Sequence, residues 1–214
     1  MHHATNHLYE DLSHHPLALS YLTILRDKTT PAPIFAATAS RLSLLIASYV
    51  TNHASYECNK IDTPLQDNVH GFVAHTPVLV PILRAGMSLL PAFQQLFPEA
   101  PIGFAGVGRN KATHIAEFYS WVMPNVKGKT VYLLDPMLAT GSSAILVIDR
   151  LLEAGAKHIH LATVIASRQG VNTINSKYPT DVTVHTATID NVLNENNYIV
   201  PGLGDFGDRL YGTF

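Results

Sequence analysis

The most informative stretch of this chain is Val131-Tyr132-Leu133-Leu134-Asp135-Pro136-Met137-Leu138-Ala139-Thr140-Gly141-Ser142-Ser143. Its first four residues are apolar and predict a buried strand that carries Asp135 to its carboxyl end. A short loop follows, and the Thr-Gly-Ser-Ser segment then opens a helix. The first N–H groups of a helix lack intrahelical partners and lie at the positive end of its dipole, so this turn predicts a phosphate-binding loop. Helix N-capping alone is the alternative, and Asp135 at the strand end favours the phosphate.

Apolar runs and helical patterns alternate on both sides of this stretch. Strands are predicted at 78–83, 101–107, 131–134, 158–166 and 182–187, and short strands with loops at 58–75. Helices are predicted at 35–49, 87–97, 143–154 and 170–177, the third of them ending at a left-handed Gly155. This alternation is typical of βαβ units, and it predicts an α/β fold with a mostly parallel sheet flanked by helices.

The length of 214 residues fits a single domain over 1–214. We expect residues 1–15 to form an N-terminal arm. The N-terminal third and the segment from about 190 to 214 do not follow the alternating pattern. We expect these N- and C-terminal segments to form a small hood on the domain.

Two arginines extend the candidate site beyond the phosphate loop. Arg84 and Arg109 each follow an apolar run, and residues 108–111 are predicted to form a polar loop. Ligands of parallel sheets bind beyond the carboxyl ends of the strands, so both arginines should lie at the same edge as Asp135. A guanidinium offers paired donors suited to phosphate oxygens, although a surface salt bridge is the alternative for either arginine.

Two other nucleotide-binding motifs do not fit this chain. A Walker-type loop needs a Lys after its last Gly, and the chain has no Gly-Lys-Ser/Thr. The segment Gly202-Leu203-Gly204-Asp205-Phe206-Gly207 matches the dinucleotide pattern G-x-G-x-x-G, but only seven residues follow it. That pattern requires a helix and a more distant acid after it, so we expect its glycines to shape a loop whose backbone faces a flat ligand.

Composition restricts the class of protein. The net charge of −2 argues against a broad basic nucleic-acid surface, and we expect no nucleic-acid partner. Charged residues are only 14% of the chain, against roughly 25% in typical domains, which suggests surface hidden in a homo-oligomer, a dimer or higher. Without a signal-peptide pattern or an apolar run of about 18 residues, we expect a cytoplasmic protein without a membrane partner.

Cysteine and histidine give weaker signals. Cys58 is the only cysteine, so an intrachain disulfide is impossible, and a half-buried, unreactive thiol is expected. Five histidines precede Pro16, namely His2, His3, His7, His14 and His15. We interpret them as surface residues of the arm, with a metal site as the alternative.

Three motifs resemble the uracil phosphoribosyltransferases, a family with the type I phosphoribosyltransferase fold. They are Val-Pro-Ile-Leu-Arg-Ala-Gly at 80–86, Asp-Pro-Met-Leu-Ala-Thr-Gly at 135–141, and Tyr-Ile-Val-Pro-Gly-Leu-Gly-Asp-Phe-Gly-Asp at 198–208. Weaker similarity lies at 25–28 and 63–65, so the resemblance runs from about residue 15 to residue 214. It implies that uracil and phosphoribosyl diphosphate give UMP and diphosphate, with Mg²⁺ bound together with phosphoribosyl diphosphate.

The resemblance assigns roles by position. For phosphoribosyl diphosphate it implies Arg84, Arg109, Asp135, Pro136, Met137, Leu138, Ala139, Thr140, Gly141, Ser142, Ser143 and Asp205. For uracil it implies Ile199, Gly204, Asp205 and Phe206, with the Phe206 ring as a stacking face. Arg84, Arg109 and Asp205 are candidate transition-state contacts. No general base and no direct protein ligand for Mg²⁺ is assigned.

The chain also departs from the family pattern. Ser142 stands where the family usually has Gly, so its side chain either crowds the phosphate loop or adds a hydrogen bond. Residues 110–121 lack the family's acid-rich pattern and are expected to form a mobile loop over the site. Residues 28–33 diverge as well, which leaves GTP activation open. Two alternatives to the enzyme are a nucleotide-sensing relative with little turnover and a transferase for another base.

Overall fold

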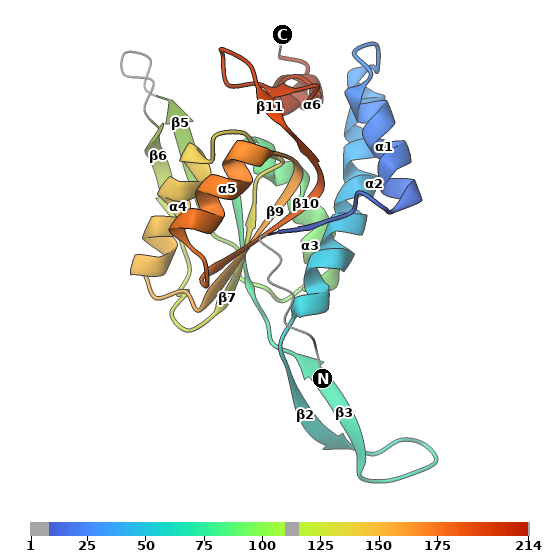
Figure 1. The fold of residues 1–214 in the computed structure, drawn as a ribbon. Coiled ribbons are helices and arrows are strands. Elements are labelled where there is room, and N and C mark those ends of the chain that lie inside the picture. Colours follow the sequence, from blue (N-terminus) through green and yellow to red (C-terminus); the bar gives the residue numbers. More distant parts are fainter. Residues whose placement is uncertain (1–8, 110–115, 214) are drawn as a thin grey trace.

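The computed structural model describes residues 9–109 and 116–213, and its centre is an eight-stranded sheet (Figure 1). Along the sheet the strands are β1 (Glu10–Asp11), β10 (Val182–Asp190), β9 (His158–Ser167), β7 (Thr130–Leu134), β4 (Val78–Leu83), β5 (Phe104–Arg109) and β6 (Ala116–Val122), while β8 (Met137–Leu138) pairs with β9. Every pairing is parallel except that of β5 with β6. The predicted α/β class with a mostly parallel sheet is confirmed.

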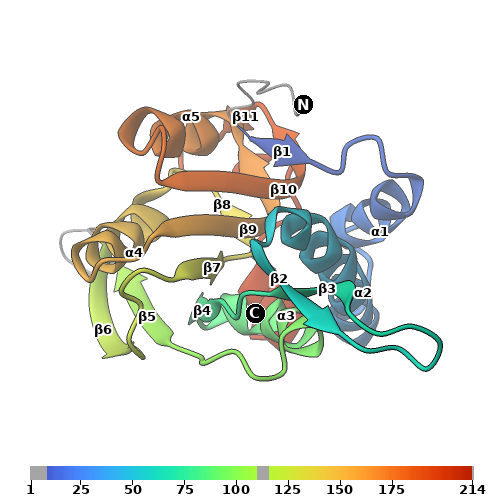
Figure 2. The ribbon, with the colours of Figure 1, turned by 90° about the horizontal axis from the view of Figure 1, so that it is seen from below.

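Helices cover both faces of this sheet (Figures 1 and 2). One face carries α1 (Pro16–Arg26), α2 (Ala32–Val50) and α3 (Leu90–Leu96), and the other carries α4 (Ser142–Glu153) and α5 (Arg168–Lys177). Successive strand residues point to opposite faces, so in β7 Tyr132 and Leu134 join the first core cluster, whereas Val131 and Leu133 join the second. The uninterrupted apolar run of β7 is therefore the signature of a strand buried on both faces.

The longest helix needs a separate explanation, because we expected no segment long and apolar enough to cross a membrane. Ala32–His53, which joins α2 to the 3₁₀ turn η1 (Thr51–His53), meets that test by length and composition. One side of the helix is buried in the core of the domain, including Phe35, Leu42 and Ile46. The apolar character of α2 is thus explained by packing against the sheet and its neighbouring helices.

A two-stranded hairpin projects from the body of the molecule, as Figures 1 and 2 show. It consists of β2 (Tyr56–Ile61) and β3 (Val69–Ala74), which pair in antiparallel register, in agreement with the short strands predicted there. Cys58 lies on it and is exposed, so the expectation of a half-buried thiol is wrong. A strand that packs against only one neighbour leaves its side chains in solvent, and the sequence pattern did not reveal that isolation.

Three predicted boundaries are wrong. Residues 87–97 are not one helix but the 3₁₀ turn η2 (Ala85–Ser88) followed by α3, which has a proline in its first turn. Residues 108–109 belong to β5 rather than to a polar loop. Of the loop expected at 110–121, residues 110–115 lie outside the described residues, and 116–121 form β6, which pairs with β5. Residues 116–121 are rich in aromatic side chains, and pairing with β5 makes them a strand rather than a loop.

The N-terminal arm expected at 1–15 is also partly wrong. Residues 1–8 lie outside the described residues, but Glu10–Asp11 extends the sheet as β1, with Glu10 opposite His185. His15 caps α1, because its Nδ1 accepts a hydrogen bond from the Ala18 N–H at 3.3 Å. The chain just before α1 is therefore integrated into the domain.

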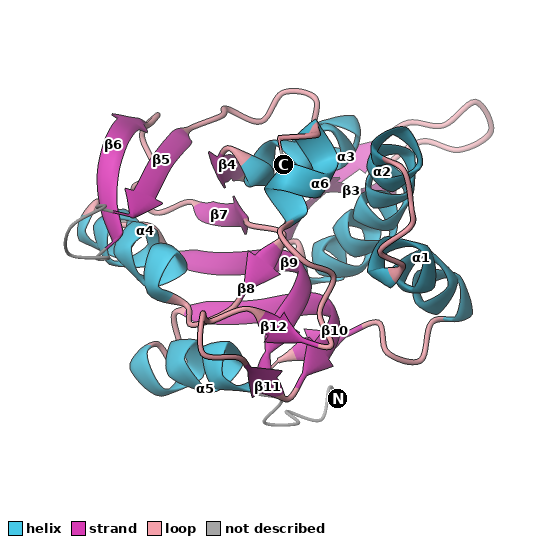
Figure 3. Ribbon diagram, turned by 90° about the horizontal axis from the view of Figure 1, so that it is seen from above, coloured by secondary structure: helices cyan, strands magenta, loops and turns pink. Residues whose placement is uncertain are grey.

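The C-terminal segment packs against the end of α1. It contains β11 (Val192–Leu193) paired with β12 (Ile199–Val200), and then α6 (Phe206–Tyr211), which lie above the sheet in Figure 1 and are seen from above in Figure 3. Arg26 donates two hydrogen bonds of 2.7 Å to the Asp190 carboxylate, which also accepts the Gly202 N–H at 2.8 Å. Arg209 is buried and donates to the Leu203 carbonyl at 2.7 Å and to the Asp27 carbonyl at 2.6 Å. Two arginines thus fix the glycine-rich loop at 202–204.

Several histidines lie near the amino ends of β9 and β10, at the edge of the sheet opposite to the C-terminal segment. His160 on β9 and His185 on β10 are both buried, and His160 Nδ1 lies 2.9 Å from His185 Nε2. Burial lowers the pKa of His160 to about 2 and also lowers the pKa of His185. Both imidazoles are therefore neutral near pH 7.

The Arg26–Asp190 pair provides a test of how the C-terminal segment is held. Asp190 is only 7% exposed, so replacing Arg26 by Gln leaves a buried carboxylate without its cation and should lower the free energy of unfolding by about 3–5 kcal/mol. The control is Lys177→Gln, which breaks a 2.7 Å ion pair whose partners are 45% and 43% exposed. That change should cost less than about 1 kcal/mol in urea denaturation. Equal losses in the two variants would contradict this account.

Candidate functional site

The register between β4 and β7 brings the first two predicted site residues together. Pro81 pairs with Leu134 in parallel, so the two strands end side by side, and Arg84 and Asp135 follow at the same edge. The turn after β4 lies unusually close to β7, because a Cβ added to Gly86 would meet the Leu134 carbonyl oxygen at 2.2 Å. Glycine at 86 is therefore needed to hold the Arg84 turn against the Asp135 loop.

A cavity of about 380 Å³ opens at this edge. Arg84, Asp135 and Met137 line it from the sheet, and Asp205, Asp208 and Tyr211 line it from the C-terminal segment. The Tyr211 hydroxyl donates to the Arg84 carbonyl at 3.2 Å, and the Arg84 guanidinium carbon lies 5.8 Å from the Tyr211 ring centre. The C-terminal segment thus forms one wall of the site and also positions the Arg84 turn.

A second, smaller cavity of about 70 Å³ is lined by the predicted phosphate loop. Its lining runs from Asp135 through Met137 to Ala144, so it shares Asp135 and Met137 with the larger cavity. Gly141 has φ +86° just before α4, a conformation that strongly favours glycine. The predicted strand–loop–helix sequence is confirmed, with α4 starting at Ser142 and β8 inserted within the loop.

Ser142, the residue that departs from the family pattern, does not crowd this loop. Its side chain is exposed, and its hydroxyl oxygen accepts a hydrogen bond from the Thr140 hydroxyl at 3.2 Å. Of the two expectations for Ser142, the added hydrogen bond is the one that the structure contains.

Two residues that the sequence analysis missed support the loop from below. The Ser167 hydroxyl donates to the Ala139 carbonyl at 2.5 Å and accepts the Gly170 N–H at 2.8 Å. A Cβ added to Gly170 would meet the same Ala139 carbonyl at 2.4 Å. Ser167 carries a readable signal as the N-cap of α5, but nothing in the sequence shows that α5 begins against the phosphate loop.

Asp135 has an unusual environment for a carboxylate. Burial raises its pKa to about 7, and a weak 3.5 Å hydrogen bond from the Met137 N–H offsets this only in part. The side chain still borders both cavities. The carboxyl group of Asp135 therefore changes its charge near neutral pH.

The predicted uracil-binding residues are only partly brought together. Asp205 caps α6 by accepting the Asp208 N–H at 2.9 Å, and it lines the 380 Å³ cavity with Phe206. The Phe206 ring is 1% exposed and packs edge-on against Phe35, with ring centres 5.2 Å apart, so the stacking expectation is wrong. The ring of Phe206 is therefore enclosed in the core, although the residue borders the cavity.

The remaining predicted residues lie around this wall. Gly204 has φ +80° and lines a neighbouring cavity of about 570 Å³ on the other side of Asp205. Ile199 is buried in β12, behind the loop, and lines neither cavity. Arg109 is the last residue of β5, and its side chain lies outside the described residues. As expected, the glycines at 202 and 204 shape a loop by adopting positive φ.

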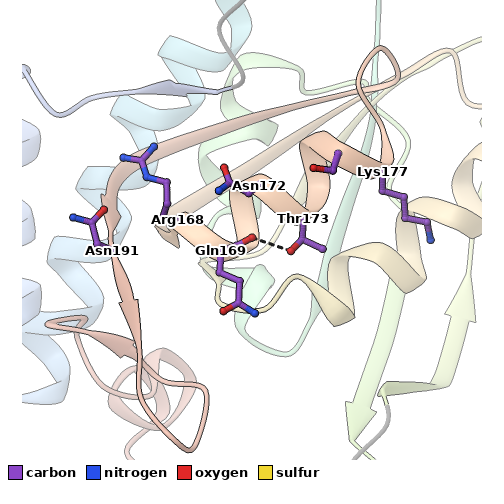
Figure 4. Close-up of a pocket in the computed structure, with 7 residues that line it drawn as sticks. Arg168, Gln169, Asn172, Thr173, Lys177 and Asn191 are labelled. Atoms are coloured by element: carbon purple, nitrogen blue, oxygen red, sulfur yellow. Dashed lines mark hydrogen bonds between the residues drawn. The ribbon is translucent and has the colours of Figure 1, made fainter.

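A cavity larger than these lies elsewhere and has a different character. It measures about 800 Å³ along the exposed side of α5, where Arg168, Gln169 and Asn172 line it together with Asn191 (Figure 4). None of the predicted site residues lines it. It is an open, polar surface depression, so the site is assigned to the two joined cavities at the strand ends.

Comparison with known proteins agrees with this geometry. The family model described as uracil phosphoribosyltransferase matches residues 12–213. The chain belongs to the uracil phosphoribosyltransferase family. A uracil phosphoribosyltransferase of Streptomyces griseus is 44% identical over 202 residues, which cover 93% of this chain and 96% of that one.

Solved structures extend the likeness to the fold. The AQ2163 protein from Aquifex aeolicus is 33% identical with a TM-score of 0.84, covering 94% of this chain and 96% of that chain. A hypoxanthine-guanine phosphoribosyltransferase from Bacillus anthracis is 10% identical with a TM-score of 0.50, covering 74% of this chain and 80% of that one. The predicted phosphoribosyltransferase-like fold is thus confirmed.

The pKa of Asp135 predicts a pH effect on stability. An unfolded Asp ionises near pH 3.8 and the folded one near pH 7, so the folded state binds more protons in that interval. The contribution of Asp135 is fully present below pH 3.8 and is lost as the pH rises to about 7. Asp135→Asn removes this titration with little change of shape. The stability difference between wild type and Asp135→Asn, measured in urea from pH 4 to 8, should shift against wild type as the pH rises. A constant difference would contradict the assignment.

Proposed function

We propose that this chain is a uracil phosphoribosyltransferase, a pentosyltransferase that transfers the phosphoribosyl group of phosphoribosyl diphosphate to uracil, giving UMP and diphosphate. The observation that carries the proposal is the meeting of a phosphate loop with an arginine-lined cavity at Asp135, in a member of this family. The smaller cavity suits the 5′-phosphate, and the larger one leaves room for the ribose, the diphosphate and a base.

The phosphate loop holds the sugar in this proposal. Backbone N–H groups at the start of α4 and the hydroxyls of Thr140 and Ser143 bind the 5′-phosphate, and Gly141 lets it approach the chain closely. Pro136, Met137, Leu138 and Ala139 give the loop its path along β9. Holding one end of the ribose fixes the direction from which the base attacks its first carbon, which is the positioning effect that such transfers need.

The arginines act on the leaving group. When the bond to diphosphate breaks, positive charge develops on the sugar and negative charge on the departing oxygens. The Arg84 guanidinium on the cavity wall, together with Arg109 at the end of β5, stabilises that negative charge more in the transition state than in the bound substrate. Asp205 on the facing wall contacts the ribose or diphosphate. No general base is assigned.

Uracil is read by backbone groups in the loop that contains Gly204, Asp205 and Phe206. A backbone N–H directed at the 4-oxo group accepts uracil and disfavours cytosine, because the amino group of cytosine is itself a donor. A buried donor left without a partner costs about 1–3 kcal/mol. Ile199 supports this loop from the core in the proposal, since the Gly202 backbone packs against its carbonyl oxygen.

Mg²⁺ fits the cavity as a companion of phosphoribosyl diphosphate. It usually keeps several waters and takes one or two carboxylates together with substrate phosphates. Three carboxylates border the cavity, those of Asp135, Asp205 and Asp208, which suits a hydrated ion without requiring a direct protein ligand. Its contribution when bound is to neutralise diphosphate charge. A GTP effector stays a separate question, which the assay below addresses when run with and without GTP.

We further propose one phosphoribosyltransferase domain over residues 1–214, acting in the cytoplasm on small molecules, without nucleic-acid or membrane partners. Supporting observations are the family match over 12–213 and the packing of α2 against the domain core. A homo-oligomer is part of the proposal. The hairpin exposes Tyr56, Phe72 and Val73 to 62%, 66% and 52%, a set of apolar side chains that a second copy would cover.

One assay tests the activity. Purified protein is mixed with phosphoribosyl diphosphate, Mg²⁺ and, in parallel, uracil, cytosine, hypoxanthine or adenine, and the nucleotide product is measured. A nucleotide product, UMP, should form in the reaction with uracil and in none of the other three reactions. Binding of substrates without UMP would favour a nucleotide-sensing relative, and a different nucleotide would favour another base, so either result would overturn the proposal.

Asp205 can be tested with a matched pair of variants. Asp205→Ala loses both the carboxylate and the α6 cap, whereas Asp205→Ser keeps a side chain that caps helices well. If the carboxylate contacts the substrate, turnover should fall about 100-fold or more in both variants, on the scale of one lost transition-state contact. Steady-state UMP formation and thermal unfolding are measured together. Recovery of wild-type turnover in Asp205→Ser would show that capping alone matters.

The oligomer proposal predicts a change in mass when the hairpin loses its apolar residues. The double variant Tyr56→Ser/Phe72→Ser should elute with a lower mass than wild type in size-exclusion chromatography with light scattering. Val122→Ser replaces a residue that is equally exposed, at 61%, but lies on β6, and it should leave the mass unchanged. A wild-type monomer, or a double variant with unaltered mass, would exclude the hairpin as the interface.

A further inference from the structure

A cluster of metal-ligand side chains lies at the edge of the sheet opposite to the substrate cavities. Glu10 comes from β1, His185 from β10, and His53 from the turn η1 that ends α2 (Figure 2). Glu10 and His185 are directly paired across adjacent strands, so their side chains leave the same face of the sheet. The proposed chemistry at Asp135 uses none of these residues.

The three ligand atoms are spaced as they would be around one ion. Glu10 Oε2 lies 2.7 Å from His53 Nε2 and 3.2 Å from His185 Nδ1, and the three atoms all lie within 4.8 Å of one another. Two ligands of a tetrahedral zinc ion, with bonds of about 2.0–2.2 Å, lie about 3.3 Å apart. Glu10 and His53 are partly exposed, so their side chains have room to rotate toward that spacing.

His185 supplies an independent observation. Its side chain is fully buried, and among the residues that the structure describes its Nδ1 has no hydrogen-bond partner, although Glu10 Oε2 lies 3.2 Å away. This unsatisfied nitrogen therefore lies on the side of the ring that faces Glu10 and His53. An ion bound by both groups would occupy that direction and satisfy a buried atom that otherwise lacks a partner.

The far side of the His185 ring is arranged as in many metal sites. A metal-bound histidine usually has its second ring nitrogen hydrogen-bonded to a neighbour, which fixes the tautomer and the ring orientation. Here His185 Nε2 lies 2.9 Å from His160 Nδ1, and His160 is buried and held between the rings of His158 and Tyr132. With Nε2 as the donor, Nδ1 of His185 is left with its lone pair free for a metal.

We propose that Glu10, His53 and His185 form a structural site for a divalent transition-metal ion of the zinc class. Two imidazoles and one carboxylate are a common protein ligand set for such ions, and a water completes the coordination on the partly exposed side. The ion ties β1 and the end of α2 to β10. Asp190, at the carboxyl end of β10, lies five residues beyond His185, or about 16 Å, so the ion stabilises the fold and takes no part in the transfer.

The test must first remove other imidazoles that bind zinc. The chain is prepared with His2, His3 and His7 replaced by Ala, treated with chelator, and titrated with Zn²⁺ alone in a calorimeter. One ion should bind per chain, and the melting temperature should rise with added Zn²⁺, since an ion that binds only the folded state stabilises it. Absence of binding at micromolar Zn²⁺ would overturn the proposal.

Matched variants locate the ion. Glu10→Gln and His53→Ala, made in the same background, should weaken Zn²⁺ binding about tenfold or more and abolish most of the melting-temperature rise. The control is His70→Ala, which removes an equally exposed histidine from the hairpin and should leave both quantities unchanged. His53 is exposed at the end of η1, so its loss leaves the core intact and the variant is expected to fold. Undiminished binding in Glu10→Gln and His53→Ala would place the ion elsewhere and overturn the proposal.

Discussion

The parallel pairing of β4 with β7 is the constraint on which the site depends. It ends two buried strands at the same edge, so that Arg84 and Asp135, about fifty residues apart in sequence, line one cavity. The pairing is close enough that only glycine fits at position 86. A guanidinium group and a carboxyl group are thereby brought to one edge of the sheet, where both line the same cavity.

Around this pair, the structure holds flexible backbone in place with a few polar side chains. Ser167 and Gly170 support the phosphate loop from the start of α5, and Arg26 and Arg209 attach the C-terminal loop to α1. The Ser167, Arg26 and Arg209 side chains bind carbonyl groups that these loops do not pair internally. A glycine-rich loop keeps one conformation only when such contacts restrict the many backbone conformations that glycine allows.

Local patterns predicted much of this molecule. The apolar run and helix start around Asp135, the parallel sheet and the two arginine positions follow from periodicity and from the behaviour of strand ends. The errors share one physical cause. The β6 strand, the exposed Cys58 and the buried Phe206 ring all depend on what packs beside a segment: β6 has a partner strand, Cys58 lies on an isolated hairpin, and Phe206 packs against Phe35.

By itself, the sequence determined the strand–loop–helix unit at residues 131–143 and the family motifs, because both depend only on residues that are adjacent in the sequence. Only the tertiary structure decided which units became neighbours. Strand order in the sheet differs from chain order, and this order placed Gly170 against the phosphate loop and Glu10 beside His185. Periodicity reports which face of a strand is buried but carries no information about its partner. The phosphate loop could therefore be predicted from sequence, and its support and the histidine cluster could not.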